Sequence, residues 1–365
     1  MNMSQQCIVF AGGGSGGTVA PGIAIAQRVA ELAPEVRCLF LCSDRQVDQS
    51  MLAAAEFEFH PMPARIPARN PMGIYRFAKG WRATRLNARP YLLPGSRVLA
   101  LGGFVAPPVV AEARTMGLDI TLLNLDQVAG RANRWIAKRA TTCLTSMPSD
   151  LKGAGTPLGV PLRKEVLATV PPAESRQRLG LDPDLQTLLV TGASQGARSL
   201  NAFMQAFLER NHEHLSGWQV VHLAGEGHQR DLLRGAYLKA GVPAQVLEFL
   251  GEMGDAWGAA DLALSRGGAS SIAEIAANDV PALIAPYPWH ADMHQAANAQ
   301  ELVEAGGVVL VEDAIAPVDN LQTIGQPLVE LLGSIRKRTA MRTALEARTH
   351  SDSADTVARR ILQVS

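Results

Sequence analysis

The stretch CIVFAGGGSGGTVAPGIAIA, residues 7–26, places an apolar run directly before a glycine-rich turn and a helical pattern. A turn of this kind exposes backbone N–H groups at the start of a helix, where they can hold a phosphate group. Gly12, Gly14 and Gly17 also fit the spacing of a dinucleotide-binding turn, and Asp44 follows the next apolar run. Many functions share this spacing, so by itself it predicts a phosphate-binding turn and leaves the ligand open.

Similar strand–helix units recur along the whole chain. Apolar runs such as RCLFLC (37–42), DITLLNL (119–125), TLLVTGA (187–193) and WQVVHLAG (218–225) alternate with helical patterns. Continuous hydrophobicity predicts strands that are buried on both faces of a parallel sheet. Proline and glycine cluster between residues 155 and 180, before a fresh series begins. The fold class expected is therefore α/β, with two Rossmann-like parallel-sheet domains whose strand ends face a cleft.

Composition excludes several classes of protein. The 34 Lys and Arg residues balance 34 Asp and Glu residues, which argues against a general nucleic-acid binder. The four cysteines lack a C-x-x-C pair and are expected to be free thiols in a reducing compartment. The first ten residues do not follow the pattern of a signal peptide, and no apolar run is long enough to span a membrane. We therefore expect a cytoplasmic protein.

Two further turns of small residues lie in the second half of the chain, in TGASQGARSLN (191–201) and SRGGASSIAEIAA (265–277). Each would open a helix with backbone donors and hydroxyl groups suited to a diphosphate. Glu274, one turn into the second of these helices, should repel phosphates unless it accepts hydrogen bonds from ligand hydroxyls such as a ribose diol. Three anion-binding turns favour a two-domain transferase with a nucleotide diphosphate ligand over a simple dehydrogenase.

These strings also resemble a known family. GGGSGGTVAPGIAIA, TGASQGARSLN, RGGASSIAEIAANDVPALIAPYP and HQAANA are similar to the MurG family, inverting transferases that use UDP-N-acetylglucosamine to convert lipid I into lipid II in peptidoglycan synthesis. LGGFVAPPVVAEARTMG, VAGRANRWIAKRAT and LGVPLRKEVLA follow in the family's order, so the resemblance covers nearly the whole chain. It implies a GT-B fold with an acceptor-binding, membrane-associating domain (1–165) and a UDP-sugar donor domain (166–349). The C-terminal helix, 350–365, would pack back on the first domain.

The resemblance implies a set of donor-binding residues. Ser194 and the turn at 268–271 would contact the diphosphate, Glu274 the ribose, and the backbone of Phe249 and Leu250 the uracil edge. Gln295 and His294 would hold hydroxyls of the sugar. The full set is Arg163, Ser194, Gln195, Phe249, Leu250, Arg266, Gly268, Ala269, Ser270, Ser271, Glu274, His294 and Gln295.

The acceptor pyrophosphate would lie at the first glycine turn, at Gly13, Gly14, Ser15, Gly16 and Gly17. The implied reaction is direct displacement of UDP by the 4-hydroxyl of an N-acetylmuramic acid unit. Developing charge on the leaving diphosphate would be stabilised by helix N-termini. No D-x-D motif occurs in the context typical of a metal-dependent transferase, so we expect no required cofactor and no divalent metal.

Two positions depart from the family pattern. Thr18 stands where the family usually has a histidine, and Asp126, in LNLDQVAG, stands where it has an asparagine. A carboxylate can take a hydroxyl proton, so Asp126 is our candidate for the general base; a structural loop carboxylate is the alternative. These departures leave open a related GT-B transferase with a different lipid or small acceptor. An NAD-dependent oxidoreductase and a sugar-nucleotide-binding protein without turnover remain further alternatives.

A basic, aromatic segment without acidic residues runs from Phe59 to Gly103. A helix is expected over about 71–87, with an apolar stripe flanked by cations. Such a helix suits an anionic membrane surface, although packing into the domain core is the alternative. The expected membrane residues are Ile74, Phe77, Trp81, Lys79 and Arg82. The expected partners are UDP-N-acetylglucosamine, undecaprenyl-pyrophosphoryl-MurNAc-pentapeptide, the cytoplasmic face of the anionic inner membrane and cell-wall synthesis proteins, with no nucleic acid.

Overall fold

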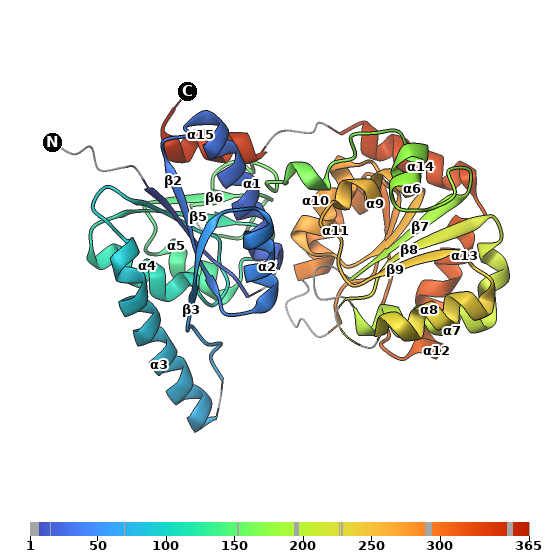
Figure 1. The fold of residues 1–365 in the computed structure, drawn as a ribbon, viewed down its shortest axis with the longest axis horizontal. Helices are drawn as coiled ribbons and strands as arrows, with labels where there is room; N and C mark the ends of the chain where they lie inside the picture. The colour runs from blue at the N-terminus through green and yellow to red at the C-terminus, as the bar shows by residue number, and fades with distance from the viewer. Residues whose placement is uncertain are drawn as a thin grey trace. The chain divides into compact units, whose positions relative to one another are not determined.

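The chain folds into two compact units in a computed structural model (Figure 1). The first unit comprises Met1–Arg163 together with Ser351–Ser365, and the second comprises Lys164–His350. The structure describes residues 7–14, 16–68, 70–151, 153–192, 197–225, 227, 229–288, 294–348 and 353–364; the side chain of His294 is not described. Each unit is a parallel sheet with helices on both faces.

The first unit is built on a six-stranded parallel sheet of order β3-β2-β1-β4-β5-β6. Its strands are β1 (Cys7–Ala11), β2 (Arg37–Ser43), β3 (Glu58–Met62), β4 (Arg97–Ala100), β5 (Asp119–Asn124) and β6 (Thr142–Thr145). On the central strand β1, Phe10 pairs with Phe40 of β2 on one side and with Leu99 of β4 on the other. The rings of Phe10 and Phe40 stack at 4.5 Å, and the five residues of β1 are all buried. Helices cover both faces of this sheet, which is why its central strand β1 is continuously apolar.

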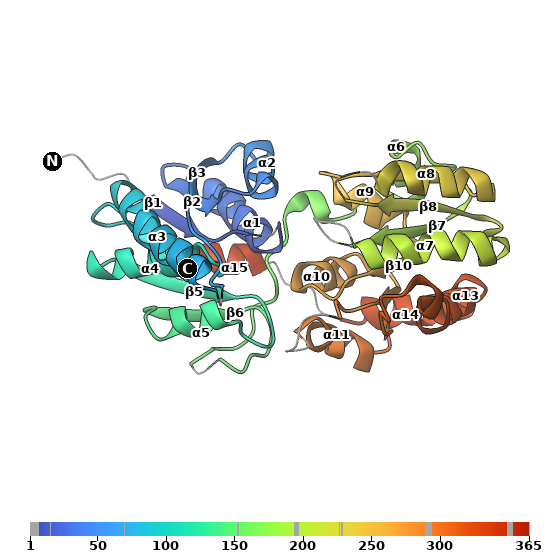
Figure 2. The same ribbon diagram turned by 90° about the horizontal axis from the view of Figure 1, so that it is seen from below.

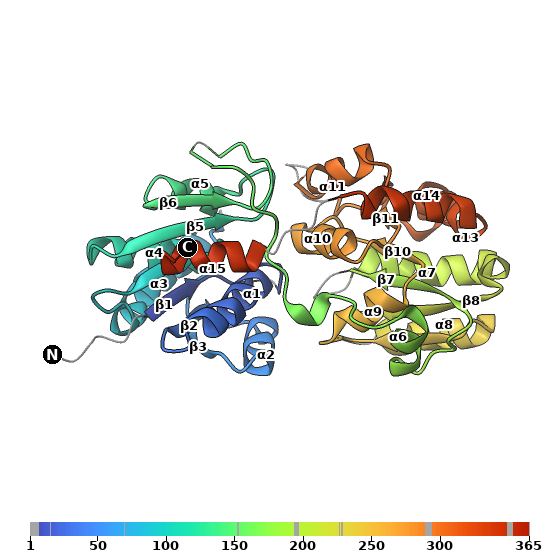
Figure 3. The ribbon, with the colours of Figure 1, turned by 90° about the horizontal axis from the view of Figure 1, so that it is seen from above.

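The described residues of the first unit form six α-helices around this sheet. They are α1 (Gly16–Leu32), α2 (Gln46–Ala54), α3 (Pro71–Ala88), α4 (Ala106–Thr115), α5 (Arg131–Ala137) and α15 (Ser353–Leu362), with a 3-10 turn at Arg89–Tyr91. The side chain of Asn70 caps α3 by accepting the N–H of Gly73 at 2.6 Å, and Pro71 occupies the first helical position. The C-terminal helix α15 lies alongside α1 (Figure 3). It buries Val357, Ala358 and Ile361 there.

The second unit repeats the architecture with a six-stranded parallel sheet of order β12-β11-β10-β7-β8-β9. Its strands are β7 (Gln186–Thr191), β8 (Trp218–Leu223), β9 (Ala244–Leu247), β10 (Leu262–Ser265), β11 (Ala282–Ile284) and β12 (Val308–Leu310). Its α-helices are α6 (Pro172–Arg178), α7 (Arg198–Asn211), α8 (Gln229–Ala240), α9 (Met253–Ala259), α10 (Ala269–Ala277), α11 (His294–Glu304), α12 (Pro317–Asn320), α13 (Gln326–Leu332) and α14 (Ile335–Glu346). Lys164–Val166 and His212–Leu215 form 3-10 turns, and Leu321–Gly325 is π-helical.

Both sheets reverse their strand order at one place, which is where open α/β sheets bind ligands. The reversal lies between β1 and β4 in the first unit and between β10 and β7 in the second. The expected α/β class with two Rossmann-like parallel-sheet domains is thereby confirmed. The glycine turn after β1 and the turn after β10 stand at these two reversals.

The cysteines are free thiols, as expected. Burial raises the pKa of Cys38 and of Cys42 to about 12, so both stay protonated and unreactive near neutral pH. Within the part of the chain that the structure describes, no helix is both long and apolar enough to cross a bilayer.

Candidate functional site

The first glycine turn is crowded at Gly13 and Gly14. Gly13 and Gly14 have φ angles of 134° and 108°, which residues with a side chain rarely adopt. A Cβ atom on Gly13 would lie 2.5 Å from a carboxylate oxygen of Asp48, and one on Gly14 would overlap the Phe104 ring. The glycines are therefore required by close packing as well as by backbone conformation.

A second glycine loop follows β4 and packs against the first. Gly103 has a φ angle of 72°, and a Cβ there would overlap the backbone carbonyl of Gly13. Because β1 and β4 are the strands between which the order reverses, their loops meet at the carboxyl edge of the sheet. The loops after β1 and β4 therefore form one continuous surface at that edge.

Asp48 on α2 fixes the shape of the first turn by a hydrogen bond to its backbone. Its buried carboxylate accepts the N–H of Gly14 at 2.7 Å and the hydroxyl of Ser43 at 2.5 Å. Arg45 donates to the carbonyl of Gly14 at 2.6 Å, and its guanidinium stands 5.6 Å from the centre of the Phe104 ring. One N–H of the turn is thus already engaged. The start of α1 carries no acidic residue in its first turn, so it retains the positive end of the helix dipole; Ser15 lies outside the described residues.

Thr18 and Asp126, the two expected acceptor-side residues, lie at the same edge of the first sheet. Thr18 is in the first turn of α1 and Asp126 follows β5, and both are half-buried. The side chain of Asn124 donates to the carbonyl of Asp126 at 2.6 Å and is itself held by Asn133 at 2.9 Å. β4 stands between the strands that carry the two residues. The loop of Asp126 is therefore anchored at its backbone.

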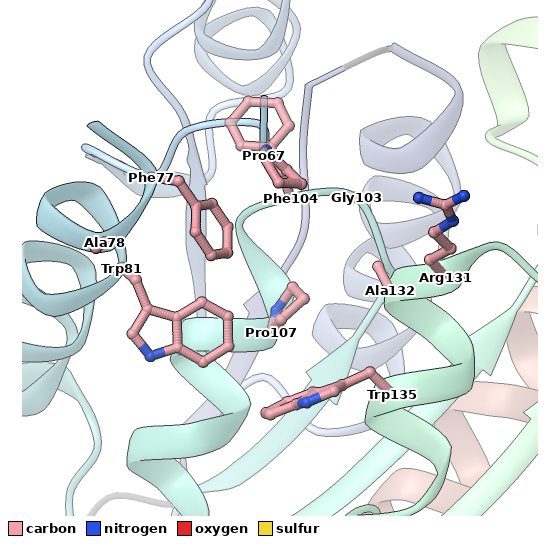
Figure 4. A pocket seen from close by; sticks show the side chains of 10 residues that line it. All are labelled: Pro67, Phe77, Ala78, Trp81, Gly103, Phe104, Pro107, Arg131, Ala132 and Trp135. Carbon is pink, nitrogen blue, oxygen red and sulfur yellow. The ribbon is translucent and has the colours of Figure 1, made fainter. Parts of the chain in front are cut away.

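The expected apolar stripe on α3 is divided into two parts. Phe77 and Trp81 are half-buried and point from α3 toward Pro107 and Trp135, as Figure 4 shows. The Phe77 and Trp81 rings lie 5.8 Å apart, and Trp81 meets Trp135 edge-on at 5.5 Å. Ile74 is 57% exposed and does not line the groove that these aromatic residues form between α3 and α5. Lys79 and Arg82, the expected cations, are exposed on the same helix.

The turn after β10 in the second unit leads into a helix start. Gly268 is the N-cap of α10 and, as a glycine, it has no side chain that could cap the helix. Ala269 and Ser271 are buried, Ser270 is half-buried, and the first turn contains no acid. The first N–H groups of an α-helix lack intrahelical partners, and the helix dipole places positive charge there, so a helix start of this kind can receive an anion.

Glu274 stands one turn further along α10. Its carboxylate accepts the indole N–H of Trp257, a buried residue of α9, at 2.9 Å. This bond fixes the orientation of one carboxylate oxygen beside the helix start. A carboxylate with a fixed orientation can accept hydrogen bonds from a pair of ligand hydroxyls.

Arg266, an expected donor-binding residue, is buried in an ion pair. Its guanidinium lies 2.8 Å from the carboxylate of Asp313 and donates to the Ser199 hydroxyl at 2.6 Å. It also donates to the carbonyls of Ala285 and Pro286, at 2.8 and 3.1 Å. Arg266 therefore joins the end of β10 to the start of α7 and to the loops after β11 and β12.

Gln295 on α11 braces the same turn. Its side-chain oxygen accepts the N–H of Tyr287 at 2.8 Å and of Gly267 at 3.3 Å, while Asn298 donates to the carbonyl of Gly267 at 3.2 Å. The helices α10 and α11 lie side by side (Figure 2). The expected partners Ser194 and Gln195, and the side chain of His294, lie outside what the structure describes.

The remaining expected donor residues lie in loops. Phe249, 52% exposed, and the half-buried Leu250 follow β9, on the carboxyl edge of the second sheet. Arg163 is half-buried and is the last residue of the first unit before the chain enters the second unit. Its Nε is buried and has no hydrogen-bond partner among the described residues. Within those residues, no three or more His, Cys, Asp or Glu side chains gather in a group that could hold a metal.

Sequence reasoning missed the residues that hold these turns in place: Asp48, Arg45, Trp257, Asp313 and Ser199. One signal was available for Asp48. It stands three and four residues before Met51 and Leu52, which are buried, so it occupies the inward face of α2. Because α2 follows β2, which is expected beside the strand that precedes the glycine turn, an acid on the inward face of α2 predicts a bond to that turn. The other four become visible only when distant segments are brought together.

Two Rossmann-like units, each with a glycine-containing turn at its strand-order reversal, define a fold of the GT-B type, the fold of nucleotide-sugar-dependent glycosyltransferases. The Glycosyltransferase family 28 N-terminal domain matches residues 8–145, and the Glycosyltransferase family 28 C-terminal domain matches residues 187–357. The chain belongs to this family of glycosyltransferases and, within it, to the MurG family, which its full-length relatives represent.

Two such relatives and one solved structure illustrate the match. The UDP-N-acetylglucosamine--N-acetylmuramyl-(pentapeptide) pyrophosphoryl-undecaprenol N-acetylglucosamine transferase of Nocardioides sp. is 32% identical over 98% of this chain and 98% of its own length. The protein of the same name from Bordetella petrii is 34% identical over 83% of this chain and 84% of its own. The crystal structure of Acinetobacter baumannii MurG has a TM-score of 0.71 at 21% identity and covers 98% of this chain and 100% of that chain, a likeness of fold.

Proposed function

We propose that this protein transfers N-acetylglucosamine from UDP-N-acetylglucosamine to the 4-hydroxyl of the N-acetylmuramic acid unit of lipid I, giving lipid II. The observation that carries the proposal is the match, over at least 83% of each chain, to transferases whose names state this donor and acceptor. The start of α10, with its glycine N-cap and no acid in its first turn, and the oriented carboxylate of Glu274 support a nucleotide-sugar donor in the second unit. The proposal requires no cofactor.

On the donor side, the backbone from Gly268 to Ser271 receives the diphosphate, and Glu274 accepts the ribose hydroxyls. The bond between the anomeric carbon and the diphosphate oxygen breaks as the acceptor hydroxyl attacks from the opposite face. Negative charge grows on the departing UDP, and the positive end of α10 stabilises it. Phe249 and Leu250 read the uracil through their backbone, and Gln295 with His294 holds the sugar. Arg163, Ser194 and Gln195 complete the diphosphate site.

Arg266 has a different part in this mechanism. Its guanidinium is bound by Asp313, Ser199 and two backbone carbonyls. It therefore holds the diphosphate-binding turn in position and does not itself bind the diphosphate. We assign it as a positioning residue of the donor site.

On the acceptor side, the lipid pyrophosphate lies at the turn from Gly13 to Gly17, at the start of α1. Asp126 takes the proton of the attacking hydroxyl, from a loop that Asn124 anchors. Thr18 occupies the position beside this turn where the family usually has a histidine.

The first unit also carries the proposed membrane contact. Ile74 and the cations Lys79 and Arg82 are exposed on α3, a combination suited to an anionic lipid surface. The enzyme would then work at the cytoplasmic face of the cell membrane, where its lipid-linked acceptor is embedded, beside other proteins of cell-wall synthesis.

The test is transfer of radiolabelled N-acetylglucosamine from UDP-N-acetylglucosamine to a short-chain lipid I analogue, with an acceptor-free control. We expect labelled lipid II analogue, and an Asp126→Ala variant should lose most of the turnover while binding donor normally. Donor binding without product would assign the protein to a related transferase with another acceptor. Binding of NADH in place of UDP would overturn the transferase assignment.

A further inference from the structure

An apolar groove lies within the first unit, between α3, α5 and the loop after β4 (Figure 4). Its volume is about 700 Å³, in the range of small-molecule sites. Nine of its ten lining residues are apolar or glycine, and Arg131 is the charged one. Phe77, Trp81 and Trp135 form most of its aromatic wall, and all three are half-buried. The groove is therefore a preformed apolar surface that water contacts until something covers it.

The groove adjoins the first glycine turn. Gly103 and Phe104 line it, and the same two residues touch the turn. The ring of Phe104 fills the space in front of Gly14, and the backbone of Gly103 lies against the carbonyl of Gly13. A ligand whose anionic head sits at the turn can thus continue directly into the groove past Phe104.

We propose that this groove binds the isoprene units of the acceptor lipid that lie next to its pyrophosphate. The inference rests on the proposed function, which places the pyrophosphate at the glycine turn. A polyprenyl chain is attached to that pyrophosphate through its first isoprene unit, and burying this apolar chain against aromatic side chains is favourable. The occupant is the substrate's own chain because the groove opens from the pyrophosphate turn.

The groove is separate from the exposed apolar residues that would meet a bilayer. Met72, Ile74 and Tyr75, near the start of α3, are each more than half exposed, and none of them lines the groove. Contact with bulk lipid is expected to depend on these residues, and recognition of the chain on the aromatic wall.

Binding of geranylgeranyl pyrophosphate and of inorganic pyrophosphate, measured by calorimetry without vesicles and with UDP present, tests the inference. We expect the prenyl compound to bind at least about tenfold more tightly, since burying a few isoprene units is worth more than the roughly 1.4 kcal/mol that this ratio represents. Ala132→Phe, which fills the groove from α5, should remove that preference and leave inorganic pyrophosphate binding unchanged. Ala78→Phe fills it from α3 and should act in the same way.

Leu86→Phe is the matched control, because Leu86 is 59% exposed on α3 and does not line the groove. It should keep the preference for the prenyl compound. Equal affinities in the unaltered protein, or a preference that survives both filling variants, would overturn the inference. A preference seen only with anionic vesicles and lost in Ile74→Ser would assign the apolar contact to the bilayer instead. The binding experiment does not require sugar transfer. A failed transfer assay would therefore contradict the proposed function without contradicting the lipid-binding groove.

Discussion

The carboxylate of Asp48 accepts the backbone N–H of Gly14 at 2.7 Å, across 34 positions of sequence. The same oxygen accepts the Ser43 hydroxyl, and the other oxygen is buried with no hydrogen-bond partner among the described residues. A buried acid therefore lies directly beneath a turn that we expect to hold a pyrophosphate. The turn is shaped before any ligand arrives, and its affinity for anions must come from the start of α1 and from Arg45.

Replacing Asp48 separates its hydrogen bond from its charge. Asp48→Asn keeps an oxygen for the Gly14 N–H and removes the charge, so the KM for the acceptor should stay the same or fall. Asp48→Ala leaves the Gly14 N–H and the Ser43 hydroxyl without an acceptor, at about 1–3 kcal/mol for each buried group. Its acceptor KM should rise about tenfold while its donor KM is unchanged. Steady-state kinetics with both substrates varied checks this.

If the Asn variant loses as much as the Ala variant, the charge itself is needed and the positioning role is wrong. If donor and acceptor KM rise together, the damage is global. Urea unfolding of both variants gives the independent measure of that damage.

The Glu274 carboxylate is expected to bind the ribose. Glu274→Ala should weaken UDP binding about tenfold or more, because a hydrogen bond to a charged group is worth about 1.5–3 kcal/mol. The loss should disappear with 2′,3′-dideoxy-UDP, which lacks the hydroxyls concerned. Isothermal titration of both nucleotides is the measurement. Glu209→Ala, on the exposed end of α7, is the control and should bind UDP normally.

An unchanged UDP affinity in Glu274→Ala would place the ribose elsewhere. An equal loss with the dideoxy nucleotide would point to disturbance of Trp257, which donates to this carboxylate.

The fold could be predicted from the sequence because its signals are local. The apolar runs that form β2 and β7 are largely buried since helices cover both sheet faces, and the glycine turns come directly after strands. The predicted helix over 71–87 is confirmed as Pro71–Ala88, because its capping asparagine and proline are adjacent in sequence. The resemblance to the MurG family is confirmed by relatives that match along the whole chain.

The interior of the site could not be predicted because its contacts join distant residues. Arg266 looks in sequence like a cation available to a ligand, and only folding brings Asp313 against it. Likewise Ile74, Phe77 and Trp81 form one stripe on a helical wheel. Trp135 on α5 packs against Trp81, so the aromatic residues are partly buried while Ile74 stays exposed.

Breaking the buried ion pair of Arg266 and Asp313 should destabilise the protein strongly. Burial alone would raise the pKa of Asp313, but hydrogen bonds from Ser199 and Asn320 and the charge of Arg266 hold that pKa below its ordinary value. Removing one partner of a buried pair leaves the other charge uncompensated and costs about 3–5 kcal/mol. Asp313→Ala should therefore lower the midpoint of denaturant unfolding markedly. Glu312→Ala, at the exposed neighbouring position, should leave it nearly unchanged; equal midpoints for the two variants would contradict this.

His222 should make the protein sensitive to mild acid. It is fully buried between Tyr237 and Asn201, at 2.9 and 3.0 Å, and burial lowers its pKa from 6.5 to about 3. Below pH 6.5 the unfolded chain binds a proton here that the folded chain excludes. Stability should be greatest above pH 6.5 and should fall by a few kcal/mol as the pH drops toward 3.

Calorimetric melting temperatures measured at several pH values below 6.5 check this dependence. His222→Gln removes the titrating group, so its melting temperature should be lower near neutral pH and should fall less steeply in acid. His214→Gln is the matched control, because His214 is exposed and its replacement should preserve the slope. A slope in His222→Gln as steep as that of the unaltered protein would assign the acid sensitivity to other groups, such as the Asp313 pair, whose lowered pKa acts in the same direction.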